Sequence, residues 1–263
     1  MNEILDGMRV LLSLSFLFYA SWSDWKKREV SNKVWLVMAP LAFALTTFQY
    51  ILFSPQLLQL YVFSFVITAA LSIALFYAGG FGGADAKALM CLALALPSYS
   101  NYLFQSDAPF VPPIFPITVF SNGVLFAAFT VVYAALRNSV WRLRTGRKIF
   151  EGFEDESTWR KVLAFFTGYK IKVSKLEKGH MYPLEDIGVK ETGETERHLL
   201  VFPKDEKVEG IVERILKAKQ EGRLQNEIWA TPGLPLLVFL TAGLIVALVF
   251  GDLVWIILRF ILA

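Results

Sequence analysis

The stretch 79-GGFGGADAKAL-89 lies between two strongly apolar segments and carries an aspartate and a lysine. The 263-residue chain around it is 55% hydrophobic and 15% aromatic, with only 19% charged residues. Such a chain is too apolar for an ordinary soluble domain. The sequence therefore predicts a mainly α-helical integral membrane protein. It also raises a question, because an acid where the chain re-enters the bilayer is costly and tends to mark a functional site.

Six segments are candidates for crossing the membrane. A spanning helix needs about 20 mostly apolar residues, and five segments approach or exceed that length. A sixth is short, although the residues after Pro97 could extend it by a turn or two. We therefore expect about six transmembrane helices. The segments are roughly 7–23, 34–53, 57–78, 86–97, 115–136 and 234–260.

The distribution of basic residues predicts how these helices are oriented. Lys and Arg follow the first, third and fifth segments, whereas the loops 54–60 and 98–114 contain none. Because Lys and Arg are retained on the cytoplasmic side, we expect a multi-pass protein of the cell membrane. With six spans, both termini lie outside.

Most of the charge is concentrated in one polar region before the last apolar segment. Its net positive charge is compatible with lying against anionic membrane lipid and gives no support for nucleic-acid binding. We expect three parts: residues 1–136 with five transmembrane helices and the candidate site, residues 137–229 as a small α+β cytoplasmic domain, and residues 230–263 with the last helix.

Short patterns inside this polar region predict its elements. The runs 157-STWRKVLAFF-166 and 208-VEGIVERILKAKQEG-222 are typical of amphipathic helices, the first capped by Ser157 or Asp155. The runs 169-YKIKVSKL-176 and 198-HLLVF-202 are typical of strands.

Neither a metal nor an organic cofactor is predicted. The single cysteine, Cys91, lies inside an apolar segment, and His180 and His198 are the only histidines. Two ligands without a third partner fall short of a zinc centre. No nucleotide-binding glycine loop or nucleophile elbow is present. Any chemistry is therefore expected among the acids at the membrane edge.

Two aspartates are predicted at the same membrane depth on two helices. The first segment ends in 21-SWSDWKKREVSN-32, which places Asp24 near the cytoplasmic face, and the fourth begins just after Asp85. Two neighbouring carboxyl groups cannot both ionise cheaply, so one retains a proton. Aspartic proteases use the two states together, one as base and one as acid. The nearby Gly82 and Gly83 would let a backbone approach closely.

Other interpretations of the same residues stay open. Asp85 is also suited to capping a helix, Asp24 to being a solvated interfacial acid, and Lys87 to being a positive-inside anchor. A proton- or ion-coupled transporter could use the same two acids, although transporter sites commonly lie near the bilayer midplane. A non-catalytic scaffold would use neither.

The motif 82-GGADAK-87 resembles GxGDxK, the second motif of the GxGD family of membrane aspartyl proteases, and Asp24 in 23-SDWKKREVSN-32 matches the first. The resemblance is closer to the archaeal type IV prepilin peptidases, which include the preflagellin peptidases. It extends to 115-FPITVFSNG-123 and 227-EIWATPGLPLL-237. Ala84 stands where the family has glycine, and alanine does not readily adopt a positive φ.

This resemblance implies an aspartic endopeptidase that removes the short basic leader from preflagellins and type IV prepilin-like precursors on the cytoplasmic side. These precursors are the expected protein partners. The resemblance implies no metal, no cofactor and no methyltransferase activity. The implied catalytic residues are Asp24 and Asp85, and the implied supporting loop comprises Gly82, Gly83, Ala84 and Lys87.

Overall fold

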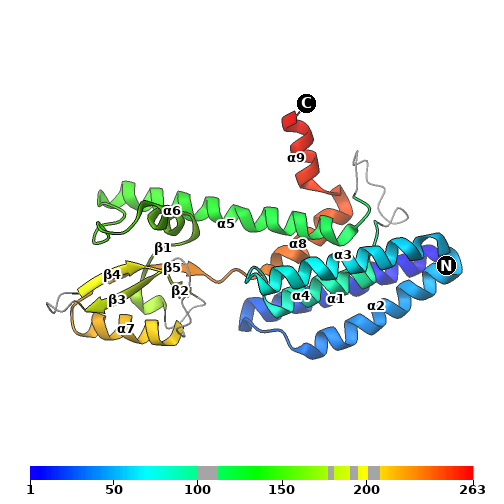
Figure 1. Cartoon of the computed structure of the whole chain (residues 1–263), viewed down its shortest axis with the longest axis horizontal. Helices are drawn as coiled ribbons and strands as arrows, with labels where there is room; N and C mark the ends of the chain where they lie inside the picture. The colour runs from blue at the N-terminus through cyan, green and yellow to red at the C-terminus, as the bar shows by residue number, and fades with distance from the viewer. Residues whose placement is uncertain (100–111, 177–180, 190–194, 201–207, 225, 263) are drawn as a thin grey trace. The chain divides into compact units, whose positions relative to one another are not determined.

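The computed structural model describes residues 1–99, 112–176, 181–189, 195–200, 208–224 and 226–262 (Figure 1). The chain forms two compact units, one comprising Met1–Ala127 with Pro235–Ala263 and the other Ala128–Leu234. The described part of the chain is mostly helical, and its strands all fall within the second unit. The predicted class, a helical membrane protein with a small α+β module, is confirmed.

The first unit is a bundle built around a short central helix. Helix α4 contacts α1, α2 and α3, and α8 packs against both α1 and α4 (Figure 1). Fully buried leucines of α4 and α8, such as Leu89, Leu92 and Leu240, form the core of the bundle. The helices are α1 (Asn2–Lys27), α2 (Asn32–Phe53), α3 (Leu58–Tyr77) after the 3-10 turn η1 (Pro55–Leu57), α4 (Gly83–Ala95), the first part of α5 (Phe115–Thr145), α8 (Leu236–Phe250) and α9 (Leu253–Leu262).

Four described helices are long and apolar enough to cross a membrane, namely α1, α2, α3 with its preceding turn, and α5. A fifth is reached if α8 and α9, which meet at 62°, form one bent span. Helix α4 has 13 residues, about 20 Å at 1.5 Å per residue, against a hydrocarbon core of about 30 Å. The expected count of about six spans is therefore not confirmed. The orientation of the termini depends on that count and stays a prediction.

The end of α4 explains how a short helix is tolerated at membrane depth. The expected extension past Pro97 does not occur up to residue 99, and its remainder lies outside the described residues. Thr46 Oγ1 of α2 donates a hydrogen bond to the carbonyl of Ala95 (3.2 Å), and Ser64 Oγ of α3 donates to that of Pro97 (2.8 Å). Carbonyl groups away from water need partners, so two hydroxyl groups replace the next turn of helix.

The last apolar segment, expected as one helix over 234–260, is broken at Gly251, whose φ is 77°. Asn122 of α5 holds the break from both sides: its side-chain N–H donates to the carbonyl of Gly251 (2.9 Å), and its oxygen accepts from the N–H of Leu253 (2.9 Å). Asp252 accepts a hydrogen bond from the N–H of Val254 (3.0 Å) and so caps α9. The break is therefore a built feature of the bundle.

Helices α5 and α8 touch backbone to backbone near this break. A Cβ atom added at Gly243 would lie 2.5 Å from the carbonyl oxygen of Val119 and 2.8 Å from the amide nitrogen of Gly123. Small residues permit such close helix crossings in membranes. Position 243 thus requires glycine because no side chain fits there, and not because the backbone has an unusual conformation.

The second unit contains an antiparallel sheet in the order β1–β5–β2 and a separate β3–β4 hairpin. Ile211 and Ile215 of α7 are buried in a core shared with Ile171 of β1 and Ile228 of β5. The elements are the second part of α5, α6 (Thr158–Thr167), β1 (Tyr169–Lys172), the 3-10 turn η2 (Val173–Lys175), β2 (Met181–Pro183), β3 (Glu185–Val189), β4 (Thr195–Leu199), α7 (Val208–Gln220) and β5 (Glu227–Pro232).

Most of the elements predicted in this region are confirmed. Both amphipathic helices are present, and the first follows Ser157 as its N-cap residue, although the Ser157 side chain makes no capping hydrogen bond. The strand expected over 169–176 ends at Lys172 and continues as a 3-10 turn. Of the run at 198–202, the first two residues belong to β4, Leu200 does not, and residues 201–202 lie outside the described ranges.

The buried carboxylate of Glu185 pairs with Arg197 within the hairpin and joins the hairpin to the sheet through Trp229. Glu185 is fully buried, accepts two hydrogen bonds of 2.8 Å from Arg197 Nη2, and accepts a third from the backbone N–H of Trp229 (3.1 Å). Burial raises the pKa of the Glu185 carboxyl, and Arg197 acts against this shift. The Leu184 N–H also donates to the Trp229 carbonyl (2.9 Å). The two hydrogen bonds of Trp229, from Leu184 and to Glu185, therefore continue the pairing with β5 where β2 ends.

Candidate functional site

Asp24 lies in the last turn of α1, which ends at Lys27. The backbone N–H of Arg28 donates to the carbonyl of Asp24 (3.0 Å), and Arg28 takes a left-handed φ of 57°, which stops the helix. Ser23 Oγ donates to the carbonyl of Glu29 (2.7 Å) and ties the following turn back to the helix. The half-buried Asp24 is thus carried on a firmly terminated helix end.

Asp85 is the third residue of α4 and is also half-buried. One of its carboxylate oxygens, Oδ2, accepts a hydrogen bond from the backbone N–H of Gly82 (2.9 Å), as an acid in the first turn of a helix commonly does. The alternative of Asp85 as the N-cap residue is wrong, because Gly82 holds that position. Asp85 is the third residue of the helix and contributes to capping through its bond to the Gly82 N–H. This role does not exclude chemistry, since one bond engages only one of the two carboxylate oxygens.

The glycines before Asp85 have different roles. A Cβ atom at position 82 would lie 3.0 Å from Asp85 Oδ2, so the bare backbone of Gly82 makes room for the carboxylate. A Cβ atom at position 83 would meet the Phe76 ring at an ordinary 3.7 Å. Gly79 has a φ of 76° and turns the chain after α3. The expected close approach of another backbone at Gly82 and Gly83 stays a prediction, because the near contact at Gly82 is with the Asp85 side chain.

Alanine fits at position 84 without strain. Ala84 lies in the first turn of α4, and Arg28 is the one non-glycine residue with a positive φ in the described ranges. A glycine at this position would therefore gain nothing from its conformational freedom. The departure from GxGD leaves the local backbone helical.

The structure brings the two aspartates to the same end of the helical bundle. Helices α1 and α4 are in contact, and the Asp24 carboxylate acts electrostatically on Asp85. Lys87, two residues further along α4, donates a hydrogen bond to the side-chain oxygen of Asn32 at the start of α2 (2.7 Å). Three helix ends thus meet around a pair of acids.

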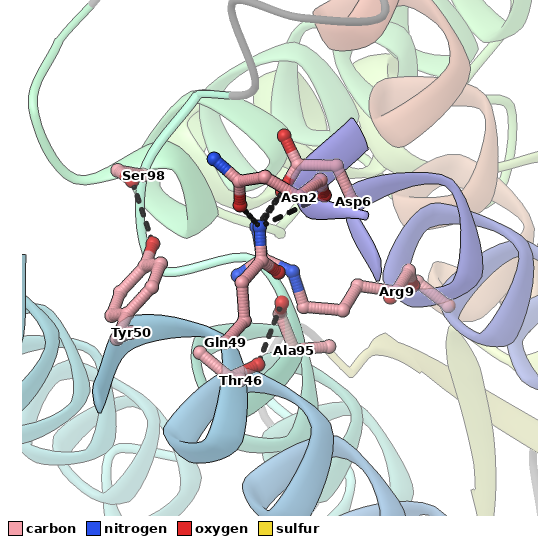
Figure 2. Close-up of polar contacts among 9 residues, drawn as sticks. Asn2, Asp6, Arg9, Thr46, Gln49, Tyr50, Ala95 and Ser98 are labelled. Atoms are coloured by element: carbon pink, nitrogen blue, oxygen red, sulfur yellow. Dashed lines mark hydrogen bonds and ion pairs between the residues drawn. The ribbon is translucent and has the colours of Figure 1, made fainter. Parts of the chain in front are cut away.

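A second polar cluster, which sequence reasoning missed, lies near the start of α1 (Figure 2). Asp6 and Arg9 form an ion pair and are each only 2% exposed. Gln49 of α2 donates to Asp6 Oδ1 (2.9 Å), and the Arg9 guanidinium lies 5.2 Å from the centre of the Tyr50 ring. Asp6 was expected ahead of the first span, whereas the structure places it within α1. The spacing of an acid and a base three residues apart in an apolar helix was the available signal.

This cluster is not part of the aspartate pair. Eighteen residues of one continuous helix separate Asp6 from Asp24, which corresponds to about 27 Å. That length is close to the thickness of the hydrocarbon core. The two polar clusters therefore occupy opposite ends of the bundle.

The remaining polar candidates do not form a metal site in the described parts of the chain. No group of three His, Cys, Asp or Glu side chains lies close enough there to hold a metal ion. His198 Nδ1 lies 3.3 Å from Glu156 Oε1. Both His180 and Asp107 lie outside the described residues.

Comparisons with known proteins place both parts of the chain. A model of the type IV leader peptidase family matches residues 11–132, which include Asp24 and Asp85. A model described as the archaeal peptidase A24 C-terminus, type II, matches residues 160–253.

Three curated relatives are similar along almost the whole chain. A preflagellin peptidase of Methanococcus voltae is 27% identical over 252 residues, covering 92% of this chain and 94% of the relative. The preflagellin peptidase of Methanocaldococcus jannaschii is 26% identical, covering 90% and 91%, and that of Methanococcus maripaludis strain C6 is 25% identical, covering 90% and 92%. All of these similarities are to peptidases, and none of them supports the transporter alternative.

Proposed function

Because this chain belongs to the type IV leader peptidase family, we propose that it is an aspartic endopeptidase whose catalytic pair is Asp24 and Asp85. Its substrates are preflagellins, as the names of its relatives indicate, and type IV prepilin-like precursors. It removes their short basic leader peptides. The observation that carries the proposal is the placement of Asp24 in the last turn of α1 and of Asp85 in the first turn of α4, two helices that are in contact.

The chemistry follows from two carboxyl groups in different protonation states. The ionised carboxylate takes a proton from a water molecule as that water attacks the peptide carbonyl carbon. The protonated carboxyl donates its proton to the developing carbonyl oxygen. Both groups must come within hydrogen-bonding reach of the same water. The hydrogen bond from Gly82 to Asp85 Oδ2 supports the proposal because it fixes the orientation of one carboxyl group.

The site faces the cytoplasm in this proposal. Lys26 and Lys27 end the helix that carries Asp24, and Lys87 lies two residues after Asp85. Basic residues next to spans are retained on the cytoplasmic side. A basic leader is held on that side by the same rule, so its junction with the apolar segment lies near the depth of the two acids.

The test is a cleavage assay in detergent with a precursor that carries a short basic leader before an apolar helix. Wild type is compared with Asp24→Asn, Asp85→Asn and the control Asp155→Asn, which changes an exposed acid of the second unit. General acid–base groups contribute roughly 10²–10⁴-fold, so we expect each active-site variant to lose at least about a hundredfold in rate. The control variant should retain full activity.

Circular dichroism and thermal unfolding must show that the inactive variants remain folded. Near-normal cleavage by either folded Asn variant would remove that aspartate from the mechanism. A wild-type protein inert towards preflagellin and prepilin-like precursors alike would remove the proposed substrates.

A further inference from the structure

The second unit contains a cationic cavity that the proposed peptidase chemistry does not use. Its volume is about 320 Å³, and it lies between the last turns of α5 and the strands β1 and β5. Arg137, Lys170, Lys172 and Lys175 line it, together with one carboxylate, Glu227. The volume falls within the range of small-molecule sites. The charge of the lining predicts an anionic occupant.

A smaller hollow of about 210 Å³ adjoins the cavity and shares Trp141, Lys170 and Glu227 with it. It adds further cations, including Arg147 and Arg197. The positive charge therefore extends past the cavity itself, and the adjoining space can accept the remainder of a ligand whose anionic group lies in the larger space.

The cations of the cavity lack close carboxylate partners in the described ranges. There, no Asp or Glu forms an ion pair with Arg137, Lys170, Lys172 or Lys175, whereas Arg197 is paired with Glu185. Glu227 stands opposite Lys172 in the β1–β5 register. Burial lowers the pKa of Lys170, and the nearby Arg197 lowers it further. An anion in the cavity would relieve this repulsion.

Aromatic contacts hold two of the cations in place. The guanidinium of Arg137 lies 3.8 Å from the centre of the Tyr169 ring and donates to the hydroxyl of Tyr133 (3.0 Å). The ammonium group of Lys170 lies 4.1 Å from the centre of the Trp141 ring. Cations held over aromatic rings lose little further freedom when a ligand binds. The cavity is thus organised before any ligand arrives.

Helix α5 is longer than a membrane span requires. It has 31 residues, about 46 Å at 1.5 Å per residue, whereas the hydrocarbon core is about 30 Å thick. Arg137 and Trp141 lie among its last ten residues. Basic and aromatic residues are enriched where helices leave the hydrocarbon core.

We propose that this cavity binds the phosphate group of an anionic ligand through Arg137, Lys170, Lys172 and Lys175. Two sources offer that chemistry: the headgroup of an anionic phospholipid and a soluble phosphate. Arg137 supplies a planar fork of donors and the three lysines supply point charges, a combination suited to phosphate oxygens.

The experiment uses the full chain in neutral detergent and needs no peptidase substrate. Native mass spectrometry would record bound phosphatidylglycerol, with phosphatidylcholine as the neutral-headgroup comparison, in the presence and absence of inorganic phosphate. The pocket variant Arg137→Gln/Lys170→Gln is compared with Arg142→Gln/Arg144→Gln. The control removes the same charge from exposed residues of the same helix that do not line the cavity.

We expect saturable binding of one phosphate-bearing ligand by wild type and by the control, and at least tenfold weaker binding by the pocket variant. Lys175→Gln alters only an exposed residue and should weaken binding about threefold without affecting folding. Retention of phosphatidylglycerol that resists inorganic phosphate identifies a lipid site, and binding of inorganic phosphate alone identifies a soluble ligand. Equal affinities of the pocket and control variants would overturn the proposal, and so would equal retention of the two lipids together with no binding of phosphate.

Discussion

Replacing Glu185 by alanine should loosen the second unit selectively. The change leaves the Arg197 guanidinium without its buried partner and the N–H of Trp229 without an acceptor. Breaking a buried ion pair costs about 3–5 kcal/mol. Because the Arg197 side chain is 18% exposed and can regain water, we take the lower end, about 3 kcal/mol. The unsatisfied amide adds about 1 kcal/mol, for a total near 4 kcal/mol.

Hydrogen exchange measured by mass spectrometry on the full chain reports this loss locally. When exchange follows local opening, a loss of about 4 kcal/mol corresponds to nearly a thousandfold faster exchange, at tenfold per 1.4 kcal/mol. The effect should appear in peptides that cover β3 and β5, where Glu185 and Trp229 lie.

Glu213→Ala is the matched control, because Glu213 is an exposed acid on α7 in the same unit. Exposed substitutions of this kind usually change stability by no more than about 0.5 kcal/mol. If Glu185→Ala accelerates exchange in β5 no more than Glu213→Ala does, the Glu185 carboxylate does not hold the hairpin to the sheet.

Three further perturbations test separate parts of the structure. Arg9→Met leaves the buried Asp6 carboxylate without its ion-pair partner and should lower the free energy of unfolding by about 3–5 kcal/mol, seen as a lower thermal midpoint in detergent. The double variant Asp6→Leu/Arg9→Met should recover most of this stability. A double variant as unstable as the single one would contradict the prediction. Gly243→Ala should push α5 and α8 apart and lower the thermal midpoint by an amount equivalent to about 1–3 kcal/mol. The control Gly7→Ala should leave the midpoint unchanged, because a Cβ atom there meets nothing within 4 Å. Equal midpoints of the two variants would show that the contact between α5 and α8 accommodates an added methyl group. Burial acts to raise the pKa of Glu156, but hydrogen bonds from the Leu199 N–H and from Arg160 outweigh it and hold the pKa below its ordinary value. The resulting stabilisation is present above about pH 4.5 and is lost as the pH falls through the lowered pKa. The thermal midpoint of Glu156→Gln should therefore depend less on pH between 6 and 3 than that of wild type, and parallel profiles of the two proteins would refute the assignment.

Sequence reasoning located most helices and both candidate aspartates, because these follow from apolar run length and short-range motifs. The pair at Asp24 and Asp85 could be predicted because basic residues fix the ends of two apolar segments at one face. A contribution of Asp85 to helix capping was equally foreseeable from its place before an apolar run.

What the sequence could not supply were features that depend on contacts between distant segments. Apolar residues run almost continuously over 234–260. The break at Gly251 is fixed by the positive φ of that residue, by the cap from Asp252 and by the contact with Asn122, more than a hundred residues earlier. Likewise, the burial of Asp6 follows from Gln49 and Tyr50 on another helix. The span count was not confirmed for a related reason, since α4 ends at Ala95, where hydroxyl groups of α2 and α3 bond the carbonyls of Ala95 and Pro97.

That dependence of α4 on its neighbours bears on how the protein is made. Helix α4 is too short to cross the membrane. The carbonyl of Ala95 accepts a hydrogen bond from Thr46, and that of Pro97, just after the helix, accepts from Ser64 and from the Phe115 N–H, so this segment is poorly suited to settle in lipid as an independent first-stage helix. Synthesis runs from the N-terminus, so α2 and α3 emerge before α4 and can already be present in the membrane when it arrives. Order of emergence is thus built into the chain, and α4 takes its place last among the first four helices.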